Sequence, residues 1–106
     1  MDKFEKLVRD KIPEIIEQNG EIPVHRQLDY AEYNEKLKLK LQEELDEVLA
    51  AKTKAELIEE LADLKEVFEA FCQNQRISED NIKQKQIVKR LDCGGFRERV
   101  YLERVK

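Results

Sequence analysis

The alternation of apolar and polar residues predicts two long amphipathic helices in the middle of the chain. From residue 29 to about 51, and again from 53 to about 75, apolar side chains recur every three or four positions, which is the spacing of one helix face. Asp29 and Thr53 each stand three positions before a glutamate, a capping-box pattern typical of a helix start. The predicted apolar stripes consist of Tyr33, Leu37, Leu41, Leu45, Val48 and Leu49 in the first helix and Leu57, Leu61, Leu64, Phe68 and Phe71 in the second.

Shorter elements are predicted on either side of these helices. Asp10-Lys11-Ile12-Pro13 indicates the start of a short helix, because proline is tolerated in a first turn, and Asn19-Gly20 ends it. Ser78 is a predicted cap for a further helix that reaches about Arg90.

Two segments show the alternation of a strand. In residues 22–28, Val24, Arg26 and Leu28 alternate with polar side chains, and in residues 96–105 Val100 and Leu102 alternate with Tyr101 and Glu103, so we expect these segments to pair as a minor β element involving the C-terminal end.

The predicted fold class is all-α, with an antiparallel helical hairpin as the core of one domain over residues 1–106. Two amphipathic helices bury little core by themselves. We therefore expect a homo-oligomer, most simply a dimer, in which two hairpins complete a four-helix bundle.

Composition narrows the class of protein. Charged residues make up 42% of the 106 residues and hydrophobic ones 41%. The sequence has no apolar run near the ~20 residues needed to cross a bilayer, and no hydrophobic signal segment at its start. Cys72 and Cys93, without a CxxC pair, indicate neither a zinc site nor a disulfide scaffold. We expect a soluble, cytoplasmic protein without a membrane partner.

The charges are unevenly distributed. Residues 32–69 contain 12 acids and 6 bases, whereas residues 76–106 contain 9 bases and 5 acids. This distribution disfavours a uniformly basic face for a nucleic-acid polymer. It suits a cation site near an anion-binding surface, although ordinary solvated helix faces would give the same balance.

Each predicted long helix carries two acids three positions apart: Glu44 with Glu47, and Glu60 with Asp63. At ~100° per residue, both pairs lie on the same side of their apolar stripes. In an antiparallel hairpin Glu47 is level with Glu60, and Glu44 with Asp63. The four carboxylates therefore either converge on the gap between the helices or all face away from it.

Converging carboxylates repel one another unless a cation neutralises them. An all-oxygen set favours Mg²⁺, Mn²⁺ or Ca²⁺, and Mg²⁺ is typically completed by water and substrate phosphates. His25 lies outside both helices, so the Glu-x-x-His pattern of di-iron bundles is absent. Alternatively, the acids are exposed and pair with lysines such as Lys40 or Lys65.

The acidic pattern resembles a family signature. The pattern is similar to the motif of the MazG-like all-α nucleoside triphosphate pyrophosphohydrolases. It consists of Glu43-Glu44-x-x-Glu47, followed after twelve residues by Glu60-x-x-Asp63. The segments KLVRDKIPEIIEQNG and CGGFRERVYLERV resemble a small house-cleaning, phosphoribosyl-ATP pyrophosphohydrolase-like branch. Cys93 stands where arginine is expected before Gly-Gly-Phe, which puts any role of that arginine in doubt.

The resemblance implies Mg²⁺-dependent hydrolysis of a nucleoside triphosphate between its α- and β-phosphates, with Mn²⁺ as a substitute ion. The metal ligands it implies are Glu44, Glu47, Glu60 and Asp63. Glu47 or Glu44 is the candidate to accept a proton from water. Glu43 falls on a different part of the helix, where we expect it to support the ligands or face a partner.

Phosphate charge needs cationic donors. The candidate phosphate-binding residues are Lys6, Arg9, Lys11 and Lys40. Each is alternatively a plain surface cation. Two other functions also fit the sequence: a non-catalytic helical interaction module, or a degenerate relative that binds nucleotides without hydrolysing them.

Overall fold

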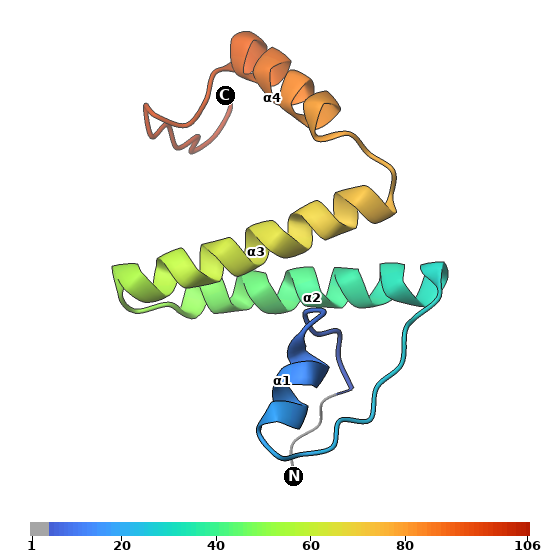
Figure 1. Ribbon diagram of the computed structural model, residues 1–106. Coiled ribbons are helices and arrows are strands. Elements are labelled where there is room, and N and C mark those ends of the chain that lie inside the picture. Colours follow the sequence, from blue (N-terminus) through green and yellow to red (C-terminus); the bar gives the residue numbers. More distant parts are fainter. Residues whose placement is uncertain (1–4) are drawn as a thin grey trace. The chain divides into compact units, whose positions relative to one another are not determined.

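The computed structural model describes residues 5–106 and contains four helices (Figure 1). The helices are α1 (Ile12–Gln18), α2 (Tyr30–Ala50), α3 (Lys54–Asn74) and α4 (Glu79–Cys93). Residues 5–106 contain no strand. The predicted all-α class is therefore confirmed, and each predicted helix begins and ends within a few residues of its expected limits.

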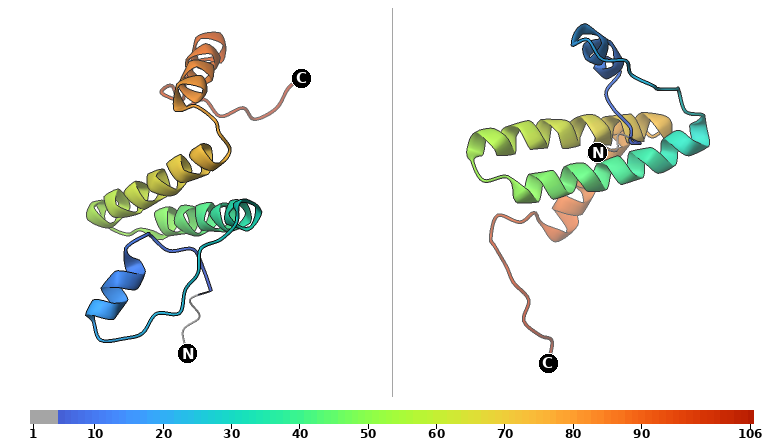
Figure 2. Two further views of the ribbon diagram at one scale, coloured as in Figure 1. Left: turned by 45° about the vertical axis from the view of Figure 1, so that its right-hand side comes forward. Right: turned by 90° about the horizontal axis from the view of Figure 1, so that it is seen from below.

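The chain divides into two compact units, one ending at Arg76 and the other spanning Ile77–Lys106. In the first unit α2 and α3 run antiparallel and side by side, as both views of Figure 2 show. The second unit consists of α4, capped by the Ser78 hydroxyl, and a tail without regular structure. Among the described helices, none has an apolar stretch long enough to cross a membrane.

The caps predicted for the two long helices are formed. The Asp29 carboxylate accepts a hydrogen bond from the backbone N–H of Glu32 at 2.8 Å, and the Thr53 hydroxyl accepts one from Glu56 at 3.1 Å. The Glu56 carboxylate accepts in turn from the N–H of Lys52 at 2.9 Å. These bonds satisfy backbone donors at the start of each helix and, through Lys52, in the α2–α3 loop.

The hairpin buries few apolar side chains by itself. Within residues 5–106, the buried hydrophobic residues are Leu37, at 1% exposure, and Cys72. Leu45, Leu61 and Phe68 belong to the predicted stripes but remain 40–45% exposed. The contact between α2 and α3 therefore covers only part of each apolar face.

The predicted minor β element is wrong. Residues 22–28 and 96–105 form no strand, and apolar side chains such as Val24 and Val100 are almost fully exposed. Alternation favours a strand only when one face has a surface to pack against, because strand preference mostly reflects burial and cross-strand contacts. In both segments such apolar side chains are exposed, so no buried face favours a strand.

Candidate metal and phosphate site

Three carboxylates from the two long helices meet in the gap between them. Glu44 of α2 and Glu60 and Asp63 of α3 each offer an oxygen, and these oxygens all lie within 4.8 Å of one another. We call these three residues the acidic triad. Their convergence resolves what the sequence left open, because the acidic edges of both helices face inward rather than away.

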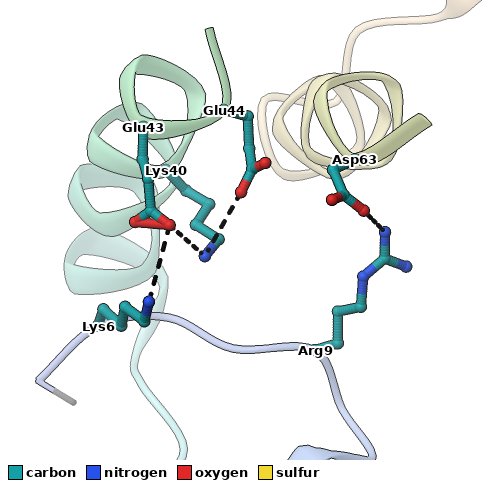
Figure 3. A network of polar contacts seen from close by, with 6 residues as sticks. All are labelled: Lys6, Arg9, Lys40, Glu43, Glu44 and Asp63. Atoms are coloured by element: carbon teal, nitrogen blue, oxygen red, sulfur yellow. Dashed lines mark hydrogen bonds and ion pairs between the residues drawn. The ribbon is translucent and has the colours of Figure 1, made fainter. Parts of the chain in front are cut away.

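Glu44 is the buried member of the triad. It is 7% exposed, and Figure 3 shows its carboxylate directed toward the gap between α2 and α3. Burial raises the pKa of Glu44 most strongly, and the charges of Asp63, Glu43 and Glu47 raise it further. Lys40, whose Nζ lies 3.7 Å from Oε1 of Glu44, opposes part of this rise.

Glu47 stands at the edge of the triad rather than within it. Partial loss of hydration raises the pKa of Glu60, and the charge of Glu47 is the next largest cause. Glu47 and Glu60 line the same open pocket near the α2–α3 loop, together with two alanines and Glu56. The structure thus brings three of the four predicted acids together and places the fourth, which is exposed, beside them.

Basic residues lie beside Glu44 and Asp63 of the triad and beside Glu43 (Figure 3). The Arg9 Nη2 donates a hydrogen bond to Oδ1 of Asp63 at 2.7 Å. Lys40 pairs with Glu43 at 3.0 Å, and Lys6 lies 3.8 Å from the same carboxylate. The segment that carries Lys6 and Arg9 therefore contacts α2 through one residue and α3 through the other.

Two further predicted site residues lie outside the triad. Glu43 is partly exposed and holds the two lysines at the neighbouring edge of α2. Lys11 is exposed at the N-terminal end of α1. Sequence reasoning proposed Arg9 as a cation but missed its partner, because residues 5–9 have no helical periodicity that could have placed them against α3.

The triad suits a small, hard cation. All its donors are carboxylate oxygens, which Mg²⁺ and Mn²⁺ accept readily. Around an octahedral ion with bonds of about 2.1 Å, ligand oxygens lie roughly 3–4 Å apart. Small side-chain rotations from the observed spacing reach that range. The raised pKa values of Glu44 and Glu60 show the electrostatic cost that such a cation would remove.

The direction of these pKa changes predicts how acidity alters stability without divalent ions. A raised folded-state pKa means that an ionised Glu44 destabilises the fold at neutral pH, and that this cost disappears below its ordinary pKa. Glu44→Gln should therefore raise the unfolding temperature at pH 7 in the presence of EDTA. At about pH 4 and below, where the native glutamate is also neutral, the advantage should vanish.

Glu32→Gln is a matched control, and its expected effect on the unfolding temperature has the opposite sign. Hydrogen bonding from Arg26 lowers the pKa of Glu32, so its charge stabilises the fold above its ordinary pKa and that contribution is lost as the pH falls through the lowered value. Glu32→Gln should lower the unfolding temperature at pH 7. Thermal unfolding at both pH values checks the pair, and two variants that shift in the same direction would contradict the assigned electrostatics.

Comparison with known proteins adds independent information. A family model described as phosphoribosyl-ATP pyrophosphohydrolase matches residues 1–91. A curated protein of Mycolicibacterium smegmatis, described as uncharacterized, is 46% identical over 54 residues, which are 51% of this chain and 55% of that protein. The chain thus spans about half the length of this relative. No solved structure matches the chain.

Proposed function

Because the chain belongs to the phosphoribosyl-ATP pyrophosphohydrolase family, a group that acts on nucleotides and generally depends on divalent metal, we propose that it is a Mg²⁺-dependent nucleoside triphosphate pyrophosphohydrolase. Water would cleave the bond between the α- and β-phosphates and release a nucleoside monophosphate and pyrophosphate. The observation that carries this proposal is the convergence of Glu44, Glu60 and Asp63 within 4.8 Å.

Each acid has a distinct place in this proposal. Glu44, Glu60 and Asp63 hold the ion, and Glu47 completes its surroundings from the edge of the pocket. When bound, Mg²⁺ or Mn²⁺ supplies neutralisation of phosphate charge and a more acidic bound water. Glu47 is exposed beside Glu60, so it can accept a proton from a water in that pocket. Glu44, which is buried, is the second candidate for this role.

The basic residues complete the proposed site. Lys6, Arg9 and Lys40 all lie beside the acids, where their charges can face the phosphates of a substrate. Lys11 follows on the same segment. Glu43 keeps Lys6 and Lys40 close to one another, which gives it a supporting rather than a ligand role.

The proposal is tested by measuring pyrophosphate release from canonical and damaged nucleoside triphosphates with Mg²⁺, with Mn²⁺ and with EDTA. We expect release from at least one triphosphate with either ion and none with EDTA. A helical interaction module would release no pyrophosphate and show no saturable Mn²⁺ binding by calorimetry. A degenerate relative would bind the ion and nucleotide without turnover. Either result would overturn the proposed activity. The cytoplasmic location is a separate prediction from the sequence.

We also propose that two copies pair through their hairpins to form a four-helix bundle. Among the described residues, the buried apolar core is very small, while Leu45, Leu61 and Phe68 leave a row of half-exposed apolar surface. A second hairpin of the same sequence offers the matching apolar stripe, and four-helix bundles bury such stripes against one another.

Leu61→Glu tests this pairing. A charge on the half-exposed stripe should weaken the dimer at least about tenfold, because burying an unpaired carboxylate costs several kcal/mol. Light scattering during size-exclusion chromatography should then give the mass of two chains for the native protein and one for the variant. Lys38→Glu adds a carboxylate at an exposed position of α2 and should remain dimeric. A native protein that is monomeric at all concentrations would contradict the proposal.

A further inference from the structure

The Arg9–Asp63 ion pair joins the N-terminal segment directly to the acidic triad. Arg9 Nη2 lies 2.7 Å from Oδ1 of Asp63, and the same carboxylate supplies one of the three oxygens that meet within 4.8 Å. A cation bound at the triad and the Arg9 guanidinium would therefore share one carboxylate. The ion and the guanidinium would both lie next to this carboxylate, and two positive charges so close together repel one another.

The ion pair is weak enough to be exchanged. The side chains of Arg9 and Asp63 are 59% and 42% exposed, and ion pairs exposed to water contribute little stability. Arg9 also lies on an irregular segment, whereas Asp63 is fixed on α3. The guanidinium can thus leave Asp63 through movement of its own side chain while the triad keeps its geometry.

A guanidinium displaced from a carboxylate needs another anion. Arginine presents a planar set of N–H donors that matches phosphate oxygens as well as carboxylate oxygens. A polyphosphate that coordinates a metal at the triad brings such oxygens to within a few ångströms of Arg9. The anion also screens the repulsion between the metal and the guanidinium.

Resting on the proposed function, we propose that Arg9 is an exchangeable counter-ion: it pairs with Asp63 in competition with the divalent ion, and transfers to the polyphosphate of the metal-bound substrate. Arg9 thus opposes binding of the ion alone and favours binding of the ion together with a polyphosphate. The site therefore binds metal and substrate cooperatively.

Arg9→Ala separates these two effects. Titration with Mn²⁺ alone should show affinity that is higher by roughly two- to fivefold, because the competing charge is gone. Titration with inorganic tripolyphosphate in the presence of Mg²⁺ should show affinity that is lower by about tenfold, because a charge-assisted contact is lost. Arg9→Lys keeps the charge but not the planar donors, so it should restore the Mn²⁺ affinity fully and the tripolyphosphate affinity only in part.

Arg26→Ala is the matched control, because Arg26 forms an exposed ion pair of the same length, 2.7 Å, with Glu32. It should change neither affinity, and circular dichroism should show equal helix content in all variants. Unchanged or lower Mn²⁺ affinity in Arg9→Ala would overturn the proposal, as would unchanged tripolyphosphate affinity. Failure of the native protein to bind Mn²⁺ would instead count against the proposed function, so the two failures are distinguishable.

Discussion

Replacing Glu60 with glutamine is expected to lower the rate of pyrophosphate release by about 100-fold or more. Glutamine has nearly the same shape, but it removes one of the three converging negative charges. Changes to residues that merely support metal ligands already cost roughly 10–100-fold, so loss of a ligand should cost at least as much. Glu44→Gln and Asp63→Asn should have effects of similar size. Steady-state assays with the best substrate from the screen give the measurement.

Glu59→Gln is the matched control for this prediction. Glu59 is the preceding residue on α3, is exposed, and points about 100° away around the helix. It carries the same charge, so its replacement separates a general effect of fewer acids from the loss of a ligand. Native activity in Glu60→Gln, Glu44→Gln and Asp63→Asn variants that fold would remove the triad from the mechanism. Equal loss in Glu59→Gln would point to net charge instead.

Divalent ions are expected to stabilise the protein strongly. A ligand that binds only the folded state at about 100 times its dissociation constant adds roughly 2.7 kcal/mol to the free energy of unfolding. For a domain of this size, that corresponds to a rise of about 10–20 °C in unfolding temperature. The cause is neutralisation of carboxylates whose charge is costly in the folded protein, because burial first and neighbouring acids second raise the pKa values of Glu44 and Glu60. Thermal unfolding with Mn²⁺ and with EDTA measures the difference.

Two controls define this second prediction. The double variant Glu44→Gln with Glu60→Gln should lose most of the stabilisation by Mn²⁺, while its stability in EDTA should be no lower than that of the native protein. NaCl at matched ionic strength should not reproduce the shift, because general screening does not fill a coordination site. A shift of equal size in the double variant would place the bound ion elsewhere.

The regular part of the fold was predictable from the sequence for physical reasons. Helix periodicity and the capping residues Asp29 and Thr53 are local signals, and both long helices begin at these caps. The candidate acids, Glu44 with Glu47 and Glu60 with Asp63, followed from the same periodicity, because residues three positions apart share a helix face and an antiparallel pair fixes their height. The sequence could not decide whether that face points inward, since this depends on rotation of the packed helices.

The irregular segments were not predictable in the same way. Residues 22–28 alternate like a strand, yet burial rather than alternation decides whether a strand forms. The contact of Arg9 with Asp63 spans 54 positions and joins a segment without periodicity to a helix. No local rule encodes such a contact, and only the charge of Arg9 indicated that it belongs near an anion.

The short connection between α2 and α3 has a consequence for how such proteins diversify. Every member of the acidic triad comes from one helix–loop–helix segment, residues 44–63, so the proposed ion ligands would be inherited as a single continuous module. The basic residues proposed to face the phosphates, Lys6, Arg9 and Lys40, lie outside this module. Selection could therefore change how a substrate is held by altering these flanking positions, while the acids that would hold the ion stay together in one segment.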